Sequence, residues 1–285
     1  MSIRDSLRFT EEHLASANIA EAKIEAELIW MHVLSVARYE LYLDGLPEVT
    51  YSTADKVQQI VSERITGKPL AYVLGIWKSY NIDMVVSPDV LIPRPETEIL
   101  IERGIEVCNS GLFGKSPVVG DIGTGCGSIA INLMLNAPAI RLFATDNSRK
   151  ALTIARQNFK RFDLYQKITV LHGDLLEPIF ALPDLVIGNL PYIPSRNIGL
   201  LQQEVRWEPR IALDGGYDGL SCFRKIAVQS RLKLNKARVI FLLEMDPHQI
   251  EDVEFIFKEQ HSEARFDVIR DLRGLDRVLE ITIGI

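Results

Sequence analysis

The sequence "VVGDIGTGCGSIAINLMLN" (118–136) predicts a buried strand, then a glycine-rich loop, then a buried helix. An apolar run reaches Asp121, and glycines follow at alternate positions, 123, 125 and 127. Glycine allows tight backbone turns and lets a ligand come close to the chain. Ligands of open α/β sheets bind where strands end in this way. The stretch therefore predicts a ligand site after the strand, and a glycine-rich turn without a ligand is the alternative.

The glycine spacing differs from that of dinucleotide-binding proteins. In their GxGxxG fingerprint the third glycine comes one residue later, and Ser128 stands where that fingerprint has Gly or Ala. An acid two residues before the first glycine is also foreign to the fingerprint. The pattern D-x-G-x-G-x-G resembles motif I of class I S-adenosylmethionine (SAM) methyltransferases. That resemblance implies a SAM site formed by Gly123, Thr124, Gly125, Cys126 and Gly127.

Strand-like and helix-like segments alternate from about residue 116 onward. Strands are expected at 117–123, 141–146, 167–174, 183–189 and 237–245, and helices at 128–136, 148–162, 219–234 and 247–260. This alternation predicts a mostly parallel sheet with helices on both faces. Two successive strands, 265–272 and 276–285, predict an antiparallel pair at one edge. We therefore expect an α/β, Rossmann-like fold with an antiparallel edge strand, and the resemblance to motif I implies that it is of the class I SAM-dependent methyltransferase type.

Residues 1–66 have a helical pattern instead. Apolar residues recur there at spacings of three and four, as on the core-facing side of a helix: Ala22, Ala26, Ile29, Val33 and Val36. The segment "TGKP" (66–69) ends this pattern, and two short β-like pieces follow it, "YVLGIW" (72–77) and "IDMVVS" (82–87). We expect a helical N-terminal domain at 1–68, a β-hairpin linker at 69–92, and, as the resemblance to motif I implies, a methyltransferase domain at 93–285.

Composition limits the class of protein. The chain has 285 residues, a net charge of −6, 47% hydrophobic and 25% charged residues, which is ordinary for a soluble globular protein. An acidic chain is not typical of a general nucleic-acid binder. The charged N-terminus is not a signal peptide. The uncharged run 122–140 fits a loop and a buried helix better than a membrane span.

Cysteine and histidine give no sign of a metal or of disulfides. The three cysteines, Cys108, Cys126 and Cys222, are far apart and form no CxxC pattern. The five histidines form no cluster with ligand spacing. This usage fits a reducing compartment. We expect a cytoplasmic protein with no bound metal and no membrane association.

Two further strand ends carry candidate ligand-binding residues. Asp146 ends the second strand, where an acid can accept hydrogen bonds from both ribose hydroxyls. Its alternative role is to cap the helix that begins near Ser148. After the third strand, Asp174 could accept from the adenine amino group and Leu175 could pack on the ring. A simple turn aspartate is the alternative for Asp174.

The segment "GNLPYIP" (188–194) follows the fourth strand, where this topology places the methyl group of the donor. An amide nitrogen is a poor nucleophile because its lone pair is delocalised, so two acceptors are needed to orient its NH₂ group. The Asn189 oxygen and the backbone carbonyl of Leu190 are suited to this, and Tyr192 can stack on a planar group. A strand-to-loop turn without this role is the alternative.

The same segment resembles the (Asn/Asp/Ser)-Pro-Pro-aromatic signature of enzymes that methylate planar nitrogens. Leu190 replaces one of the two prolines. A backbone carbonyl does not depend on residue type, and Pro191 still biases Leu190 toward an extended conformation. We therefore expect the geometry and the activity to survive this departure.

Several motifs together resemble the HemK/PrmC family, the glutamine N5-methyltransferases of peptide chain release factors. The matching segments, in order, are "PLAYVLG" (69–75), "VLIPRPETE" (90–98), "DIGTGCGSIA" (121–130), "GDLLEP" (173–178), "GNLPYIP" (188–194) and "EPRIALDGGYDGL" (208–220). "IPRPETE" beside an N-terminal helical domain is more specific than motif I, which any class I methyltransferase can carry. The resemblance covers nearly the whole chain.

This resemblance implies an acceptor, a cofactor and a partner. The acceptor is the glutamine amide of the Gly-Gly-Gln motif in class 1 release factors, and SAM becomes S-adenosylhomocysteine. The segment from Asn189 through Leu190 and Pro191 to Tyr192 holds the glutamine, while the N-terminal helices grip the release factor. Arg94 and Glu96 are structural. We expect a monomer that takes part in translation termination and has no direct nucleic-acid target.

Three rival functions share parts of this pattern. A ribosomal-protein glutamine methyltransferase has the same kind of acceptor. An N6-adenine DNA methyltransferase uses a similar motif on a flipped base, but the mixed charge of the N-terminal domain disfavours it. A SAM-binding regulator without catalysis is the third, because Leu190 departs from the signature.

Overall fold

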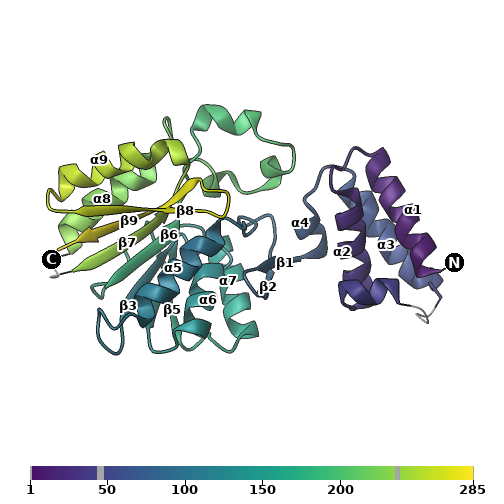
Figure 1. Cartoon of the computed structure of the whole chain (residues 1–285), viewed down its shortest axis with the longest axis horizontal. Coiled ribbons are helices and arrows are strands. Elements are labelled where there is room, and N and C mark those ends of the chain that lie inside the picture. Colours follow the sequence, from purple (N-terminus) through teal and green to yellow (C-terminus); the bar gives the residue numbers. More distant parts are fainter. Residues whose placement is uncertain (1, 44–47, 235–237, 285) are drawn as a thin grey trace. The chain divides into compact units, whose positions relative to one another are not determined.

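The computed structural model describes residues 2–43, 48–234 and 238–284. The chain forms two compact units (Figure 1). One consists of Met1–Ile76 with Gln203–Trp207, and the other of Trp77–Gln202 with Glu208–Ile285. The first unit is helical and the second is built on a seven-stranded sheet.

The helical unit is held by a small apolar core. Its helices are α1 (Ile3–Ser16), α2 (Ala22–Leu34), the 3₁₀-helix η1 (Arg38–Tyr42), α3 (Tyr51–Arg64) and α4 (Leu70–Leu74). The Ser2 hydroxyl caps α1 and the Thr50 hydroxyl caps α3, each satisfying a free backbone N–H of the first turn. In the expected stripe of α2, Ala22, Ala26 and Ile29 are buried, but Val33 is half-buried. Val36 lies beyond the end of the helix.

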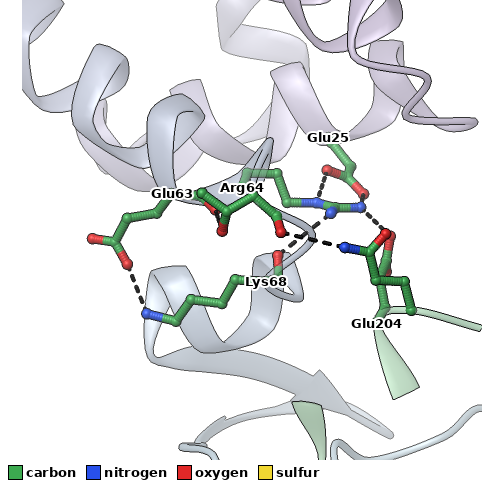
Figure 2. Close-up of polar contacts among 7 residues, drawn as sticks. Glu25, Glu63, Arg64, Lys68 and Glu204 are labelled. Carbon is green, nitrogen blue, oxygen red and sulfur yellow. Dashed lines mark hydrogen bonds and ion pairs between the residues drawn. The ribbon is translucent and has the colours of Figure 1, made fainter. Parts of the chain in front are cut away.

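Arg64, at the end of α3, is a buried cation of this unit (Figure 2). Its side chain is 2% exposed. Its Nε and Nη2 contact the two oxygens of Glu25 at 2.7 and 2.9 Å, and Nη2 also pairs with Glu204. The neighbouring Gln203 donates from Nε2 to the Thr66 carbonyl at 3.4 Å. Segment 203–207 is thus held to the helical unit by the Arg64 side chain and the Thr66 carbonyl.

The expected strand "YVLGIW" (72–77) is only partly a strand. Residues 70–74 form helix α4, because Pro69 precedes it at the cap position and Gly75 ends it with φ of 70°. The hairpin itself is shorter, with strands β1 (Ile76–Ser79) and β2 (Ile82–Val85). Asn158 fixes it to the α/β unit, accepting from the Val85 amide at 2.8 Å and donating to its carbonyl at 2.9 Å.

The α/β unit has the strand order β5-β4-β3-β6-β7-β9-β8. The strands are β3 (Val118–Ile122), β4 (Arg141–Asp146), β5 (Ile168–His172), β6 (Leu185–Asn189), β7 (Val239–Glu244), β8 (Arg265–Arg270) and β9 (Asp276–Ile283). Strands β3 to β7 pair in parallel, and β9 pairs antiparallel with β7 and with the edge strand β8. The predicted fold class is confirmed. The first residue of the expected strand 237–245 and the last of 276–285 lie outside the described residues.

Helices cover both faces of this sheet, with α8 and α9 on one face and α5, α6 and α7 on the other (Figure 1). The helices are α5 (Thr97–Asn109), α6 (Ser128–Asn136), α7 (Arg149–Arg161), α8 (Ser221–Lys233) and α9 (Ile250–Gln260), with 3₁₀-helices η2 (Ser195–Leu200), η3 (Val205–Trp207), η4 (Arg210–Ala212) and η5 (Pro247–Gln249). None of the helices among the described residues has the length and apolar character to cross a membrane.

The sheet order places the glycine loop after β3 beside the segment that follows Asn189 at the end of β6. From β3 the chain moves outward through β4 to β5, and it then returns to the other side of β3 at β6. In open α/β sheets the crevice at such a reversal is where ligands bind. The loop 123–127 follows β3 and the segment 190–194 follows β6, so both border this crevice.

Candidate functional site

A cavity of about 640 Å³ lies at the carboxyl ends of β3, β4, β5 and β6. Its volume is in the usual range for a cofactor-sized ligand. Most of the residues predicted as sites line it: Gly123, Thr124, Gly125, Cys126, Asp146, Asp174, Leu175, Asn189, Leu190 and Pro191. Gly127 and Tyr192, also predicted, are not among the lining residues.

The glycine loop needs its glycines for two different reasons. Gly123, Gly125 and Gly127 all have left-handed backbone angles, with φ of 69°, 56° and 87°, where side chains are strained. A Cβ at Gly127 would also lie 2.6 Å from the ring of Phe159 on α7. Gly127 therefore allows a helix to pack closely, while Gly123 and Gly125 open the cavity wall.

Asp121 holds the glycine loop in place through Thr124. The Thr124 hydroxyl donates to its Oδ2 at 2.6 Å, and the Thr124 amide donates to the Thr145 carbonyl of β4 at 2.9 Å. Asp121 is fully buried, and its Oδ1 has no hydrogen-bond partner among the described residues. Burial raises the pKa of Asp121 to about 7, against the opposing effect of the Thr124 hydrogen bond. The acid of the motif is thus a structural anchor for the loop.

Asp146 connects the end of β4 to the glycine loop. Its Oδ2 accepts from the Gly125 amide at 3.0 Å and its Oδ1 accepts from the Ser148 amide at 2.8 Å. The cap of α7 is Ser148 itself, whose hydroxyl accepts from the Ala151 amide, so Asp146 is not the helix cap. Desolvation raises the pKa of Asp146. A carboxylate has about four acceptor positions, so each oxygen keeps capacity for a ligand hydroxyl.

Asp174 and Leu175 follow β5 and line the cavity. Asp174 forms an ion pair with Lys225 of α8 at 3.1 Å. Leu175 is 7% exposed and has a left-handed backbone, with φ of 52°. The Thr145 hydroxyl holds this turn by donating to the Leu175 carbonyl at 3.0 Å. An apolar side chain is thereby fixed at the cavity wall.

Asn189 ends β6 with its amide held in one direction. Its Nδ2 donates to the Thr97 hydroxyl oxygen at 3.1 Å, at the first residue of α5. Within the described residues, no hydrogen bond uses the Asn189 Oδ1 or the Leu190 carbonyl. Both residues line the cavity, and the binding of an acceptor amide by these two oxygens stays a prediction.

Leu190 is a packing residue as well as a lining residue. Its side chain is 1% exposed and belongs to the core cluster on the α8 and α9 face. Its Cδ2 lies 3.4 Å from the position that a Cβ on Gly123 would take. The residue that replaces a proline therefore packs beside Gly123 of the glycine loop.

Tyr192 lies beside the core in this structure. It is half-buried and packs against the core cluster, and its carbonyl accepts from Gln249 Nε2 at 3.0 Å. Burial raises its pKa to about 12, with Glu244 acting in the same direction and Arg277 opposing. Its predicted stacking on a planar acceptor stays a prediction.

A buried ion pair joins two of the motifs near the cavity. Arg94 lines the cavity and pairs with Glu208, whose side chain is 1% exposed. Glu208 also accepts from the Ile92 amide at 3.0 Å. Burial raises the pKa of Glu208, and Arg94 opposes this. Sequence reasoning named Arg94 as structural but did not find its partner, because no local pattern links residues so far apart.

Two family descriptions match parts of the chain. Residues 5–75 match "PrmC N-terminal domain" and residues 105–203 match "Methyltransferase small domain". A ribosomal protein L11 methylase from Lactobacillus delbrueckii subsp. bulgaricus has a similar fold, with a TM-score of 0.50, 21% identity, and coverage of 70% of this chain and 84% of that chain.

Curated relatives match over nearly their whole length. A release factor glutamine methyltransferase from Moorella thermoacetica is 33% identical over 278 residues, which is 97% of each chain. One from Chlorobaculum tepidum is 35% identical over 286 residues, 98% of this chain and 96% of the relative. At this identity and coverage, the chain belongs to the release factor glutamine methyltransferase family.

Proposed function

We propose that the chain transfers a methyl group from SAM to the side-chain amide nitrogen, N5, of the glutamine in the Gly-Gly-Gln motif of class 1 release factors. The observation that carries this proposal is the pair of free acceptors at the end of β6. The Asn189 Oδ1 and the Leu190 carbonyl are adjacent along the chain, and both residues line the cavity. The curated relatives supply the release factor as the class of substrate.

The cavity residues fit SAM. The glycine loop has no Cβ at Gly123 or Gly125, which lets the ligand approach the backbone. The spare acceptor positions of Asp146 suit the two ribose hydroxyls. Leu175 offers an apolar contact for the adenine ring, and Asp174 offers an acceptor for its amino group.

The chain contributes positioning to the reaction, and SAM contributes the electrophile. When bound, SAM supplies a methyl carbon on a positively charged sulfur: the glutamine nitrogen bonds to that carbon, the carbon–sulfur electron pair stays on sulfur, and the nitrogen releases one proton to water. Asn189 and Leu190 accept the two amide N–H groups and thereby aim the nitrogen along a fixed direction. Their oxygens also stabilise the positive charge that develops on the NH₂ group as the new bond forms.

The test is a methylation assay with the purified full-length chain. Methyl-labelled SAM is combined separately with release factors, with ribosomal proteins and with DNA from the same organism, and labelled peptides are mapped by mass spectrometry. We expect one methyl group on the Gly-Gly-Gln glutamine and none on a release factor whose glutamine is replaced by asparagine. Label on a ribosomal protein or on adenine would overturn the substrate. SAM binding without any label would support the non-catalytic alternative.

A further inference from the structure

Behind the candidate glutamine site lies a buried carboxylate that the proposed reaction does not use directly. Glu244 ends β7 and is paired in register with Asn189 at the end of β6. It is 1% exposed and does not line the cavity. Thr97, 8% exposed at the first residue of α5, contacts both residues. Its hydroxyl oxygen accepts from Asn189 Nδ2 at 3.1 Å. The same hydroxyl, as a nearby donor, lowers the pKa of the Glu244 carboxyl.

When Glu244 is ionised, only one set of hydrogen-bond directions is possible among Glu244, Thr97 and Asn189. A carboxylate only accepts, so the single hydroxyl proton of Thr97 must point to Glu244. The Thr97 oxygen can then only accept, and the group that it faces on Asn189 must be the NH₂ end. The carbonyl end of the Asn189 amide is consequently turned away from Thr97, toward the cavity.

Several charges surround Glu244 from the elements packed around it. Burial raises the pKa of Glu244 to about 7, and the Thr97 hydrogen bond opposes this most. Arg277 on β9 and Arg94 before α5 also lower it, while Glu96 at the start of α5 raises it. Tyr192, whose own pKa is raised, is neutral in this range. Glu244 Oε2 has no hydrogen-bond partner among the described residues.

We propose that Glu244 and Thr97 are positioning residues for this methyl transfer: Glu244, acting through the Thr97 hydroxyl, fixes the Asn189 amide with Oδ1 toward the acceptor glutamine. The inference rests on the proposed function, because the glutamine NH₂ group is what needs an acceptor there. An inverted Asn189 amide would present its own NH₂ group to the glutamine NH₂ group, and two donors cannot hydrogen-bond.

This arrangement depends on pH in a defined direction. Below about pH 7 Glu244 gains a proton and can donate to Thr97. The Thr97 proton is then free to point at Asn189, and the inverted amide becomes accessible. The turnover number is expected to fall as the pH decreases through about 7, while the affinity for SAM stays constant.

The first experiment compares kcat, KM and SAM affinity for the wild type and four variants from pH 6 to 9. Thr97→Val removes the acceptor, and we expect kcat to fall about tenfold, the factor for one lost hydrogen bond. Thr97→Ser restores the hydroxyl and should recover most of the activity. Glu244→Gln should lower kcat by a similar factor and remove the pH limb. Glu280→Gln is the control, because Glu280 is a buried carboxylate of the same sheet that pairs with Arg103 instead.

The second experiment reads the Asn189 side chain without turnover. In the full-length protein labelled with ¹⁵N-asparagine, the Asn189 NH₂ signals, assigned by their loss in Asn189→Asp, should shift with a midpoint near pH 7. The shift should be absent in Glu244→Gln and present in Glu280→Gln. If Thr97→Val and Glu244→Gln both turned over as fast as the wild type, the positioning role would be overturned. A wild type without turnover would overturn the proposed function, and the NMR titration would still decide the amide orientation.

Discussion

Asn189 and Glu244 stand side by side in register at the carboxyl ends of two parallel strands, the amide half-buried and the carboxylate almost fully buried. Side chains at paired positions of neighbouring parallel strands point to the same face of the sheet. The first residue of α5, Thr97, is within hydrogen-bonding distance of Asn189. The Asn189 side chain at the end of β6 is therefore held by a polar contact to helix α5.

Replacing Asn189 tests the acceptor role. We expect Asn189→Ala to lower kcat by ~10²–10³-fold, the range for losing one preorganised polar contact in an active site. The affinity for SAM should change little, because the backbone of β6 and the glycine loop are left in place. Asn197→Ala is the matched control, since Asn197 is exposed in the same loop. Near-wild-type activity with a release factor would show that Asn189 does not hold the glutamine.

Asp146 tests the SAM site separately from the acceptor site. Asp146→Asn keeps the shape of the side chain but loses its charge and one acceptor. We expect the dissociation constant for SAM to rise about tenfold, because hydrogen bonds to charged groups are worth about 1.5–3 kcal/mol and part of this is retained. Isothermal titration calorimetry measures it. Asp252→Asn, an exposed change in the first turn of α9, is the control. Unchanged SAM affinity in Asp146→Asn would place the ribose elsewhere.

The sheet and most of the site were predictable because they depend on local patterns. Alternating apolar and amphipathic segments indicated the parallel strands, and short motifs followed three of their ends. The antiparallel closing pair was indicated by two strands with a short link. What the local pattern did not indicate was helix α4 within 70–74, where a proline before and a glycine after outweigh the β-like side chains.

Contacts between distant segments were not predictable from one sequence. The ion pair between Arg94 and Glu208 and the contact between Thr97 and Asn189 join positions that are about a hundred residues apart. The placement of Gly127 against Phe159 is also set by helix packing. Residues of one motif have different roles. Only the tertiary structure distinguishes those that line the cavity from those that support the loop.

Leu190 tests whether the family's second proline matters for the chemistry. Leu190→Pro keeps the backbone carbonyl, which is the atom that the proposed acceptor role uses. We expect kcat to stay within about threefold, because a backbone acceptor does not depend on residue type. Stability should fall by about 1–3 kcal/mol, since a buried leucine side chain is truncated. Urea denaturation and steady-state kinetics measure the two effects. A large loss of kcat at unchanged stability would implicate the Leu190 side chain itself.

Asp121 should make the stability of the α/β unit depend on pH. Its pKa is about 7 in the folded chain, well above the usual value for an aspartate in the unfolded chain. The folded state therefore binds more protons between the two values, and its stability falls as the pH rises through this window. Above pH 7 the full cost of the buried charge applies.

The variant Asp121→Asn removes this titration while leaving an oxygen to accept from Thr124. Relative to the wild type, its free energy of unfolding should increase from pH 5 to pH 8. Denaturation in guanidinium chloride at both values measures the difference. Asp276→Asn, at an exposed ion pair with Arg270, should show no such trend. A constant difference between wild type and Asp121→Asn would mean that Asp121 does not titrate in this range.

Arg64 makes two ion pairs in the helical unit whose partners differ in burial (Figure 2). The Glu25 side chain is 14% exposed and meets the guanidinium through both oxygens, whereas Glu204 is 47% exposed. Because Arg64 itself is buried, losing the bidentate partner leaves a poorly compensated charge, and we expect Glu25→Gln to cost about 3 kcal/mol. Glu204→Gln removes a half-exposed contact and should cost no more than about 1 kcal/mol.

Hydrogen exchange on the full-length protein measures these costs where they arise. Amides of α2 and α3 should exchange faster in Glu25→Gln and nearly as in the wild type in Glu204→Gln, because exchange reports the free energy of local opening. Glu63→Gln, which alters only the exposed pair with Lys68, is the matched control. Equal acceleration in both variants would show that burial does not determine how much each ion pair contributes to stability. Faster exchange confined to segment 203–207 in Glu204→Gln would show that this ion pair serves to hold that segment on the helical unit.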